Sequence, residues 1–120
     1  MSRILLIDDD GDMMLLTARW LKRAGYEVDT ASSGEEALAF LAGTKPDLIL
    51  LDYAMPQMDG SATFAAIRAQ DSLKSIPVLF RTGIDDGTAA EITERLHPDG
   101  VVLKSEGKAQ LLKAVAEALG

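Results

Sequence analysis

The chain has 120 residues, 48% of them hydrophobic and 26% charged, with a formal net charge of −7 and no cysteine. This length and composition predict a single domain over residues 1–120 that lies in water, since a membrane span needs about 18 consecutive apolar residues. The missing cysteines exclude disulfides, thiolate zinc sites and cysteine nucleophiles, and the acidic balance argues against a nucleic-acid-binding face, which depends on accumulated lysine and arginine.

The amino-terminal segment MSRILLIDDD reaches three acidic residues after only four apolar ones. A secretory signal needs a longer apolar region, so we expect a cytoplasmic protein. Met1 stands just before the first predicted strand, and we therefore expect it to be a true amino terminus, although the sequence fits both a single-domain protein and a domain cut from a longer chain. The single histidine, His97, is followed by a proline and has no second histidine with which to form a metal site. We therefore interpret His97 as a surface residue in a turn.

Five segments have the length and apolar content of β-strands. They are residues 3–7 (RILLI), 27–31 (EVDTA), 47–51 (DLILL), 76–80 (IPVLF) and 100–104 (GVVLK). The first, third and fifth do not alternate between apolar and polar residues. This pattern is typical of strands that are covered on both faces in a parallel sheet.

Between these segments, apolar residues recur at helical spacing. The first helix has Asp12 as its expected N-cap and ends at Gly25, and the second has Ser33 as its expected N-cap and ends at Gly43. The fourth predicted helix is shorter than the others. In chain order, the apolar stripes are Met13, Leu16, Trp20 and Ala24; Ala37, Leu38 and Leu41; Phe64 and Ile67; Ile92 and Leu96; and Leu112, Val115, Ala116 and Leu119.

Strand and helix thus alternate five times, which predicts right-handed crossovers and a parallel sheet with helices on both faces. The fold class is α/β: a doubly wound (βα)5, flavodoxin-like, three-layer sandwich with a five-stranded sheet in the order 2-1-3-4-5. In such folds, ligands bind at the carboxyl ends of the strands. Side chains that follow the strands are therefore the candidates for a functional site.

Acidic residues follow two strands that are neighbours in this order. Asp8, Asp9 and Asp10 follow the first strand, and Asp52 follows the third. Carboxylates that meet at one edge raise one another's pKa or require a cation. Oxygen ligands without cysteine or histidine suit Mg²⁺, with Mn²⁺ as an alternative. The sequence therefore predicts a metal site at this edge.

The fourth strand ends in Arg81, Thr82 and Gly83, and the fifth ends in Lys104. A hydroxyl, a backbone N–H and an ammonium group, together with an acid and a divalent cation, can hold a phosphoryl group. Taken singly, each signal has a simpler interpretation as a helix cap, a solvated loop charge or a surface residue. The prediction rests on all of them lying at the carboxyl ends of strands.

The segments RILLIDDD, PDLILLDYAMPQMDG, IPVLFRTG and GVVLK, in this order, resemble the receiver domain of two-component response regulators. The resemblance covers essentially the whole chain, and MPQMDG is its most specific part. It implies that Asp52 is phosphorylated by a sensor histidine kinase or a histidine phosphotransfer protein. The receiver would catalyse its own Mg²⁺-dependent phosphorylation and dephosphorylation, and would change conformation for a downstream partner, without being an enzyme in the usual sense.

The resemblance also implies roles for individual residues, with Asp10 as a neighbour of the site and not a ligand. Mg²⁺ would be bound by the carboxylates of Asp8, Asp9 and Asp52 and by the backbone carbonyl of Ala54. The phosphoryl oxygens would be bound by the hydroxyl of Thr82, the ammonium group of Lys104 and the backbone N–H of Gly83.

The chain departs from the family pattern at several positions. Ser105 follows Lys104 where relatives usually have proline, and Val101 stands where they usually have an aromatic residue that reports phosphorylation. We therefore hypothesise intact phosphorylation chemistry with an atypical output surface. The main alternative is a degenerate receiver that acts as a phosphorylation-independent protein-binding module. Ala54 and Ile84 lie two residues after Asp52 and Thr82, at positions where polar side chains in relatives help to place the hydrolytic water. Because neither residue is polar, we predict slow self-dephosphorylation.

The first predicted helix offers a clue about partners. Met14, Leu15 and Ala18 lie beside its core stripe and form an apolar edge near the acidic residues. In the family, this helix receives the helical pair that carries the donor histidine, and such docking needs an apolar patch. The alternative is that these three residues simply widen the buried stripe.

Other function classes fit less well. The opening LLIDDDGD also fits haloacid dehalogenase-like phosphatases, but their acidic motif follows the lysine, whereas Asp85 and Asp86 precede Lys104. A calcium loop would need a glycine and a glutamate where the chain has Met13 and Arg19. Three acids at the end of the first strand would also repel the phosphate of a flavin cofactor.

Overall fold

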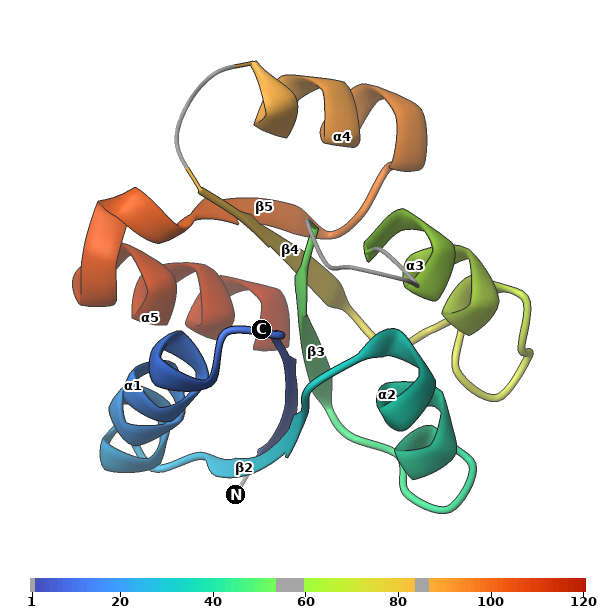
Figure 1. Cartoon of the computed structure of the whole chain (residues 1–120), viewed down its shortest axis with the longest axis horizontal. Helices are drawn as coiled ribbons and strands as arrows, with labels where there is room; N and C mark the ends of the chain where they lie inside the picture. Colours follow the sequence, from blue (N-terminus) through green and yellow to red (C-terminus); the bar gives the residue numbers. More distant parts are fainter. Residues whose placement is uncertain (1, 54–59, 84–86) are drawn as a thin grey trace.

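The computed structural model describes residues 2–53, 60–83 and 87–120 (Figure 1). Within these ranges, strands alternate with helices along the chain. The strands are β1 (Arg3–Ile7), β2 (Glu27–Ala31), β3 (Leu48–Asp52), β4 (Val78–Thr82) and β5 (Gly100–Leu103). The helices are α1 (Gly11–Arg23), α2 (Gly34–Leu41), α3 (Gly60–Arg68), α4 (Thr88–Leu96) and α5 (Gly107–Leu119), with a short 3₁₀ helix, η1 (Lys104–Glu106).

The strands form one parallel sheet in the order β2-β1-β3-β4-β5, so the predicted fold class and strand order are confirmed. Helices α1 and α5 cover one face of the sheet, and α2, α3 and α4 cover the other (Figure 1). Right-handed crossovers between parallel strands produce this three-layer arrangement. Among the described residues, no helix is both long enough and apolar enough to cross a bilayer.

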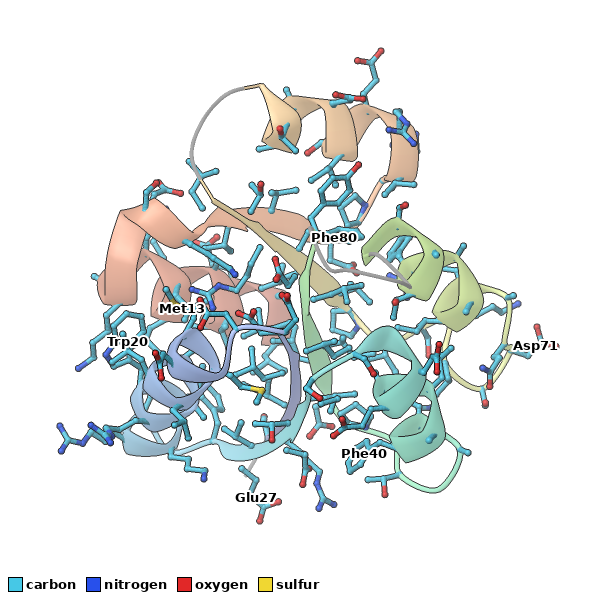
Figure 2. The ribbon with its side chains drawn as sticks, viewed as in Figure 1. Met13, Trp20, Glu27, Phe40, Asp71 and Phe80 are labelled. Atoms are coloured by element: carbon cyan, nitrogen blue, oxygen red, sulfur yellow. The ribbon has the colours of Figure 1, made fainter. Side chains whose placement is uncertain are left out.

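The core consists of two apolar clusters, one on each face of the sheet. Residues Leu50 and Leu79 face α1 and α5, whereas Leu51 and Phe80 face α2, α3 and α4. Phe80 packs against Phe64, with their ring centroids 5.3 Å apart. Figure 2 shows Phe80 toward the centre of the molecule and Glu27 and Asp71 pointing outward from its periphery. The central strands are therefore covered on both sides, as their unbroken apolar sequences predict.

The predicted ends of β1 and β2 are correct, but the later strands differ. β3 and β4 continue to Asp52 and Thr82, one and two residues past the predicted ends, and β5 stops at Leu103 instead of Lys104. The extension occurs because backbone pairing continues beyond the apolar residues: the N–H of Tyr53 donates to the carbonyl of Arg81 at 2.9 Å. The sheet therefore holds the backbone of Asp52 directly.

The predicted buried faces of the first and last helices are partly wrong. In α1, the buried residues are Thr17, Ala18 and Leu21, whereas Leu16 of the predicted stripe is 40% exposed and Ala24 is also exposed. The polar Thr17 lies on the buried face because its hydroxyl accepts a hydrogen bond there. In α5, Leu111 and Val115 are buried, whereas the predicted Ala116 is exposed.

The helix ends show which predicted caps form. Asp10, and not Asp12, caps α1, because its Oδ1 accepts hydrogen bonds from the N–H groups of Asp12 and Met13 at 3.1 and 3.2 Å. Ser33 caps α2 as predicted, with its Oγ accepting from the N–H of Glu36 at 3.1 Å. His97 is exposed at the end of α4, as predicted.

Candidate functional site

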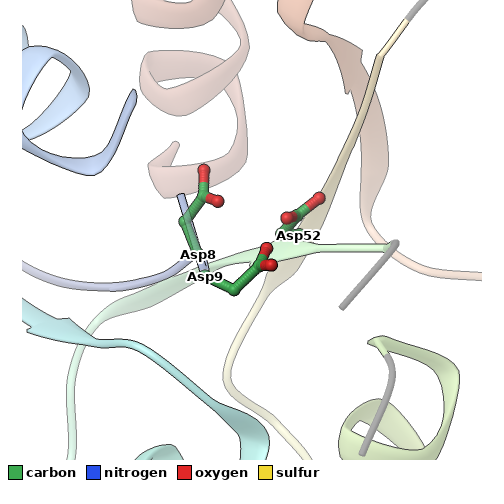
Figure 3. Close-up of side chains that lie close together, drawn as sticks. All are labelled: Asp8, Asp9 and Asp52. Carbon is green, nitrogen blue, oxygen red and sulfur yellow. The ribbon is translucent and has the colours of Figure 1, made fainter. Parts of the chain in front are cut away.

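Three carboxylates gather at the carboxyl ends of β1 and β3 (Figure 3). Asp8 and Asp9 follow β1, and Asp52 is the last residue of β3. Because Ile7 pairs with Leu51 in the sheet, Asp8 and Asp52 lie at the same level on neighbouring strands. One oxygen of each of the three carboxylates lies within 4.8 Å of the others. Asp8 is 1% exposed and Asp52 is 5% exposed, whereas Asp9 is exposed.

Lys104 brings a positive charge to these acids. Its Nζ lies 3.2 Å from Oδ2 of Asp8 and 3.4 Å from Oδ2 of Asp52. It is placed there because it directly follows β5, at the same edge of the sheet. Oδ1 of Asp8 accepts a hydrogen bond from the N–H of Asp10, whereas the buried Oδ2 has, within the described part of the chain, only the ion pair with Lys104. The structure thus brings Asp8, Asp9, Asp52 and Lys104 together.

Thr82 and Gly83 lie at the end of β4, the strand next to Asp52. Thr82 is buried and pairs with Leu103 across to β5. The carbonyl of Gly83 accepts a hydrogen bond from the N–H of Ser105 at 3.2 Å, which ties the end of β4 to the segment after Lys104. A proline in place of Ser105 would have no N–H to donate.

Ala54 and Ile84 lie outside the described residues, so the predictions that rest on them remain predictions. Gly60, the last residue of the motif MPQMDG, is described and begins α3. Its N–H donates to the carbonyl of Tyr53 at 2.9 Å, and a Cβ at this position would lie 2.5 Å from the carbonyl oxygen of Asp52. The close approach of α3 to the backbone of Asp52 and Tyr53 therefore requires glycine.

The environment of Asp52 makes its carboxyl group harder to ionise. Burial is the largest cause and the nearby Asp8 is the next, and together they raise the pKa of Asp52 to about 7, although Lys104 acts to lower it. Without a further cation, a substantial fraction of Asp52 is therefore protonated near neutral pH. Shifts of this kind are common at functional sites.

A buried arginine adjoins this cluster. Arg81 is 2% exposed, and its Nη1 donates to Oγ1 of Thr17 at 2.9 Å. Burial lowers the pKa of Arg81, and the charges of Asp8 and Asp52 act to raise it. The sequence places Arg81 at a strand end but does not reveal its burial. The available signal was its position immediately before Thr82 in a strand next to Asp52.

The predicted apolar edge of α1 is only partly exposed. Leu15 is 68% exposed, but Ala18 is buried and Met14 packs partly against the core. A shallow pocket on this helix is lined by Leu15, Ala18, Arg19, Lys22 and Arg23. The exposed apolar residues of α1 are thus Leu15 and Leu16, with Leu15 beside basic side chains, and the interpretation as a widened buried stripe holds for Met14 and Ala18.

Comparisons with known proteins agree with this architecture. The family model described as the response regulator receiver domain matches residues 4–116. Transcriptional regulatory protein PrrA of Mycobacterium leprae is 42% identical over 88 residues, which are 72% of this chain and 38% of that protein. Protein PilG of Pseudomonas aeruginosa is 33% identical over 116 residues, which are 94% of this chain and 84% of that protein.

Among solved structures, chemotaxis protein CheY4 of Vibrio cholerae matches with a TM-score of 0.90 and 30% identity, covering 98% of each chain. The chain spans 38% of the length of the PrrA proteins it matches. The family match extends over β1 to α5 and includes the acids, the threonine and the lysine at the carboxyl edge of the sheet. The chain therefore belongs to the receiver domain family of two-component response regulators.

Proposed function

We propose that this receiver accepts a phosphoryl group on Asp52 from a phosphohistidine of a sensor histidine kinase or a histidine phosphotransfer protein. The observation that carries the proposal is the position of the Asp52 carboxylate: 5% exposed, at the end of the central strand, and 3.4 Å from Nζ of Lys104. The sheet holds it rigidly while two further acids lie beside it. We further propose that residues 1–120 form one receiver domain that acts in the cytoplasm.

The acids at this edge fit a hard divalent cation. Asp8, Asp9 and Asp52 offer only oxygen ligands, which suit Mg²⁺ or Mn²⁺. Among the described residues, the buried Oδ2 of Asp8 has no hydrogen bond beyond its 3.2 Å ion pair with Nζ of Lys104, so a cation would add a further contact there. The backbone carbonyl of Ala54 is the proposed fourth protein ligand. When bound, the cation would supply positive charge that offsets the repulsion between the Asp52 carboxylate and the incoming phosphoryl group.

The transfer follows from the chemistry of the side chains. An oxygen of ionised Asp52 attacks phosphorus, a P–O bond forms, the P–N bond to the donor histidine breaks, and the imidazole nitrogen takes up a proton. Lys104 shifts from the Asp52 carboxylate to the phosphoryl oxygens. The hydroxyl of Thr82 and the backbone N–H of Gly83 complete the set of donors to these oxygens.

The new negative charge then acts on the ends of β4 and β5. Thr82 moves toward the phosphoryl group, and the hydrogen bond between Gly83 and Ser105 carries this movement to η1 and α5. Val101 is partly buried and packs against the cluster that contains Phe80. Because valine stands where relatives usually have an aromatic residue, rotation of an aromatic ring at this position is not the signal in this chain. A downstream partner would therefore recognise a surface change built on β5 and α5.

Intact-mass spectrometry tests the proposal. The protein is incubated with acetyl phosphate and Mg²⁺, beside an Asp52→Asn variant and a sample with EDTA. We expect one phosphoryl adduct on the wild-type protein and none in either control. Val101 and Ser105 favour the phosphorylation-independent binding module as the second candidate. That function would gain support if the wild-type protein formed no adduct and also failed to bind beryllofluoride.

A further inference from the structure

Arg81 is a fully buried cation that the phosphotransfer steps above do not use. It is 2% exposed, and its buried Nε has no hydrogen-bond partner among the residues that the structure describes. Its Nη1 donates to Oγ1 of Thr17, whose residue is also completely buried. One hydrogen bond to a neutral hydroxyl does not compensate for the loss of water around a guanidinium group. Arg81 therefore needs a source of negative charge nearby.

The acidic site supplies that charge. Arg81 and Asp52 are register partners on adjacent strands, so both side chains project from the same face of the sheet at the same level. This face is the one covered by α1 and α5, as shown by Leu50 and Leu79, which lie two residues earlier on the two strands. The carboxylates of Asp8 and Asp52 both act to raise the pKa of Arg81.

Lys104 and Arg81 thus place positive charge near the acidic site in different ways. Among the described residues, the ion pairs within the site are those of Lys104 with Asp8 and Asp52. Lys104 is partly exposed, on a flexible side chain that can follow a phosphoryl group. Arg81, by contrast, is buried beneath α1, where its Nη1 is anchored by the hydroxyl of Thr17. Its charge acts on the site through space.

We infer that Arg81 is a positioning residue whose fixed positive charge partly offsets Asp8 and Asp52 from within the protein, weakening divalent-cation binding and favouring added negative charge on Asp52. The inference rests on the proposed metal-dependent phosphorylation. A bound divalent cation is repelled by Arg81, whereas the phosphorylated state, which carries more negative charge, is attracted to it. Arg81 therefore makes the site depend less on the metal.

Four variants separate the charge of Arg81 from its hydrogen bond. Arg81→Met and Arg81→Gln are neutral, and the glutamine amide still has a donor for Thr17. Arg81→Lys and Thr17→Val keep a positive charge but change or remove the hydrogen bond. All four are measured as the full chain, by isothermal titration calorimetry with MgCl₂ at about pH 8.

If the charge is what acts on the site, both neutral variants bind Mg²⁺ about tenfold more tightly than wild type, and both charged variants stay within about twofold. This direction is informative because a variant that merely distorted the site would bind Mg²⁺ more weakly. Equal or weaker binding by both neutral variants would overturn the inference. The inference would also be overturned if Mg²⁺ affinity followed the presence or loss of the Thr17 hydrogen bond, and not the charge at residue 81.

A second measurement does not depend on metal binding. In EDTA at about pH 8, the urea midpoints of Arg81→Met and Arg81→Gln are compared with and without Asp52→Asn. We expect each neutral substitution to lower the midpoint less when Asp52 is absent, because one of the charges that Arg81 offsets is gone. Equal shifts in both backgrounds would contradict the inference. Failure of wild type to bind Mg²⁺ would instead count against the proposed metal site.

Discussion

The carboxyl group of Asp52 is placed for reactivity at a cost in stability. Burial and the neighbouring Asp8 disfavour its ionised form, and Lys104 only partly offsets them, which leaves its pKa at about 7. A group of this kind becomes a nucleophile when additional positive charge arrives. The stability of the metal-free protein should therefore depend on pH, because ionisation of Asp52 is unfavourable in the folded state.

Because the pKa of Asp52 is raised from 3.8 to about 7 on folding, the folded protein binds more protons than the unfolded chain between these values. The free energy of unfolding of the metal-free protein should therefore decrease as pH rises through this window, by on the order of 1–2 kcal/mol after allowance for solvent near the site. Urea unfolding in EDTA across the window measures this contribution. Asp52→Asn should lack it; an unchanged pH dependence in that variant would contradict the account.

At the level of single residues, the sequence predicts those side chains that follow strands in a parallel sheet. Asp8, Asp9 and Lys104 are found beside Asp52 because strand ends can be recognised and carboxyl ends meet at one edge. The burial of Arg81 could not be predicted, because it depends on the register between two strands and on a hydroxyl from a distant helix.

At the level of elements, the segments after β4 and β5 are joined by the hydrogen bond from Ser105 to Gly83. These are the two segments that carry Thr82 and Lys104, so the bond couples two groups that would hold the phosphoryl oxygens. The serine thus provides a connection that the proline usual in the family cannot make. We expect this bond to contribute both to stability and to the position of Lys104.

Ser105→Pro should lower the free energy of unfolding by about 1 kcal/mol, because it removes a backbone donor that is used in the folded state. Ser105→Ala keeps the N–H and is the matched control. Urea unfolding of both variants measures the difference. A proline variant as stable as the alanine variant would show that the bond from residue 105 to Gly83 contributes nothing measurable.

The elements also show where pattern-based prediction fails. Helices α1 and α5 are predicted to exist, but their buried faces are rotated from the expected stripes toward Thr17 and Leu111. Apolar counting treats threonine as a solvent-facing residue, whereas here its hydroxyl is satisfied by Arg81 inside the protein. Strands β3 and β4 run past their apolar residues because hydrogen bonding to neighbouring strands determines their ends.

At the level of the whole molecule, the regular alternation of strands and helices is enough to predict the layers and the strand order. This topology places the carboxyl ends of β1, β3, β4 and β5 at one edge. It also places α1 directly after the acids of β1, with Leu15 exposed beside Arg19 and Lys22. On a chain with a net charge of −7, this helix presents a local apolar and basic surface.

Leu15→Asp should greatly reduce phosphotransfer from a phosphorylated kinase or phosphotransfer protein, because it places a charge in the docking surface proposed for the donor. Its free energy of unfolding should change by less than about 0.5 kcal/mol, since Leu15 is exposed. Ala116→Asp, at an exposed position on α5, is the control. Phosphorylation by acetyl phosphate should be unchanged in both variants. Normal transfer to Leu15→Asp from its cognate donor would exclude this surface.

The central claim, that Asp52 carries the phosphoryl group as an acyl phosphate, is tested most directly by chemical trapping. Borohydride reduces an aspartyl phosphate to homoserine, whose position peptide mass spectrometry then identifies. After phosphorylation in the presence of Mg²⁺, we expect homoserine at position 52 alone, and none when EDTA is added before the phosphodonor. Homoserine at position 8 or 9, or a phosphoryl adduct that yields no homoserine, would contradict the account.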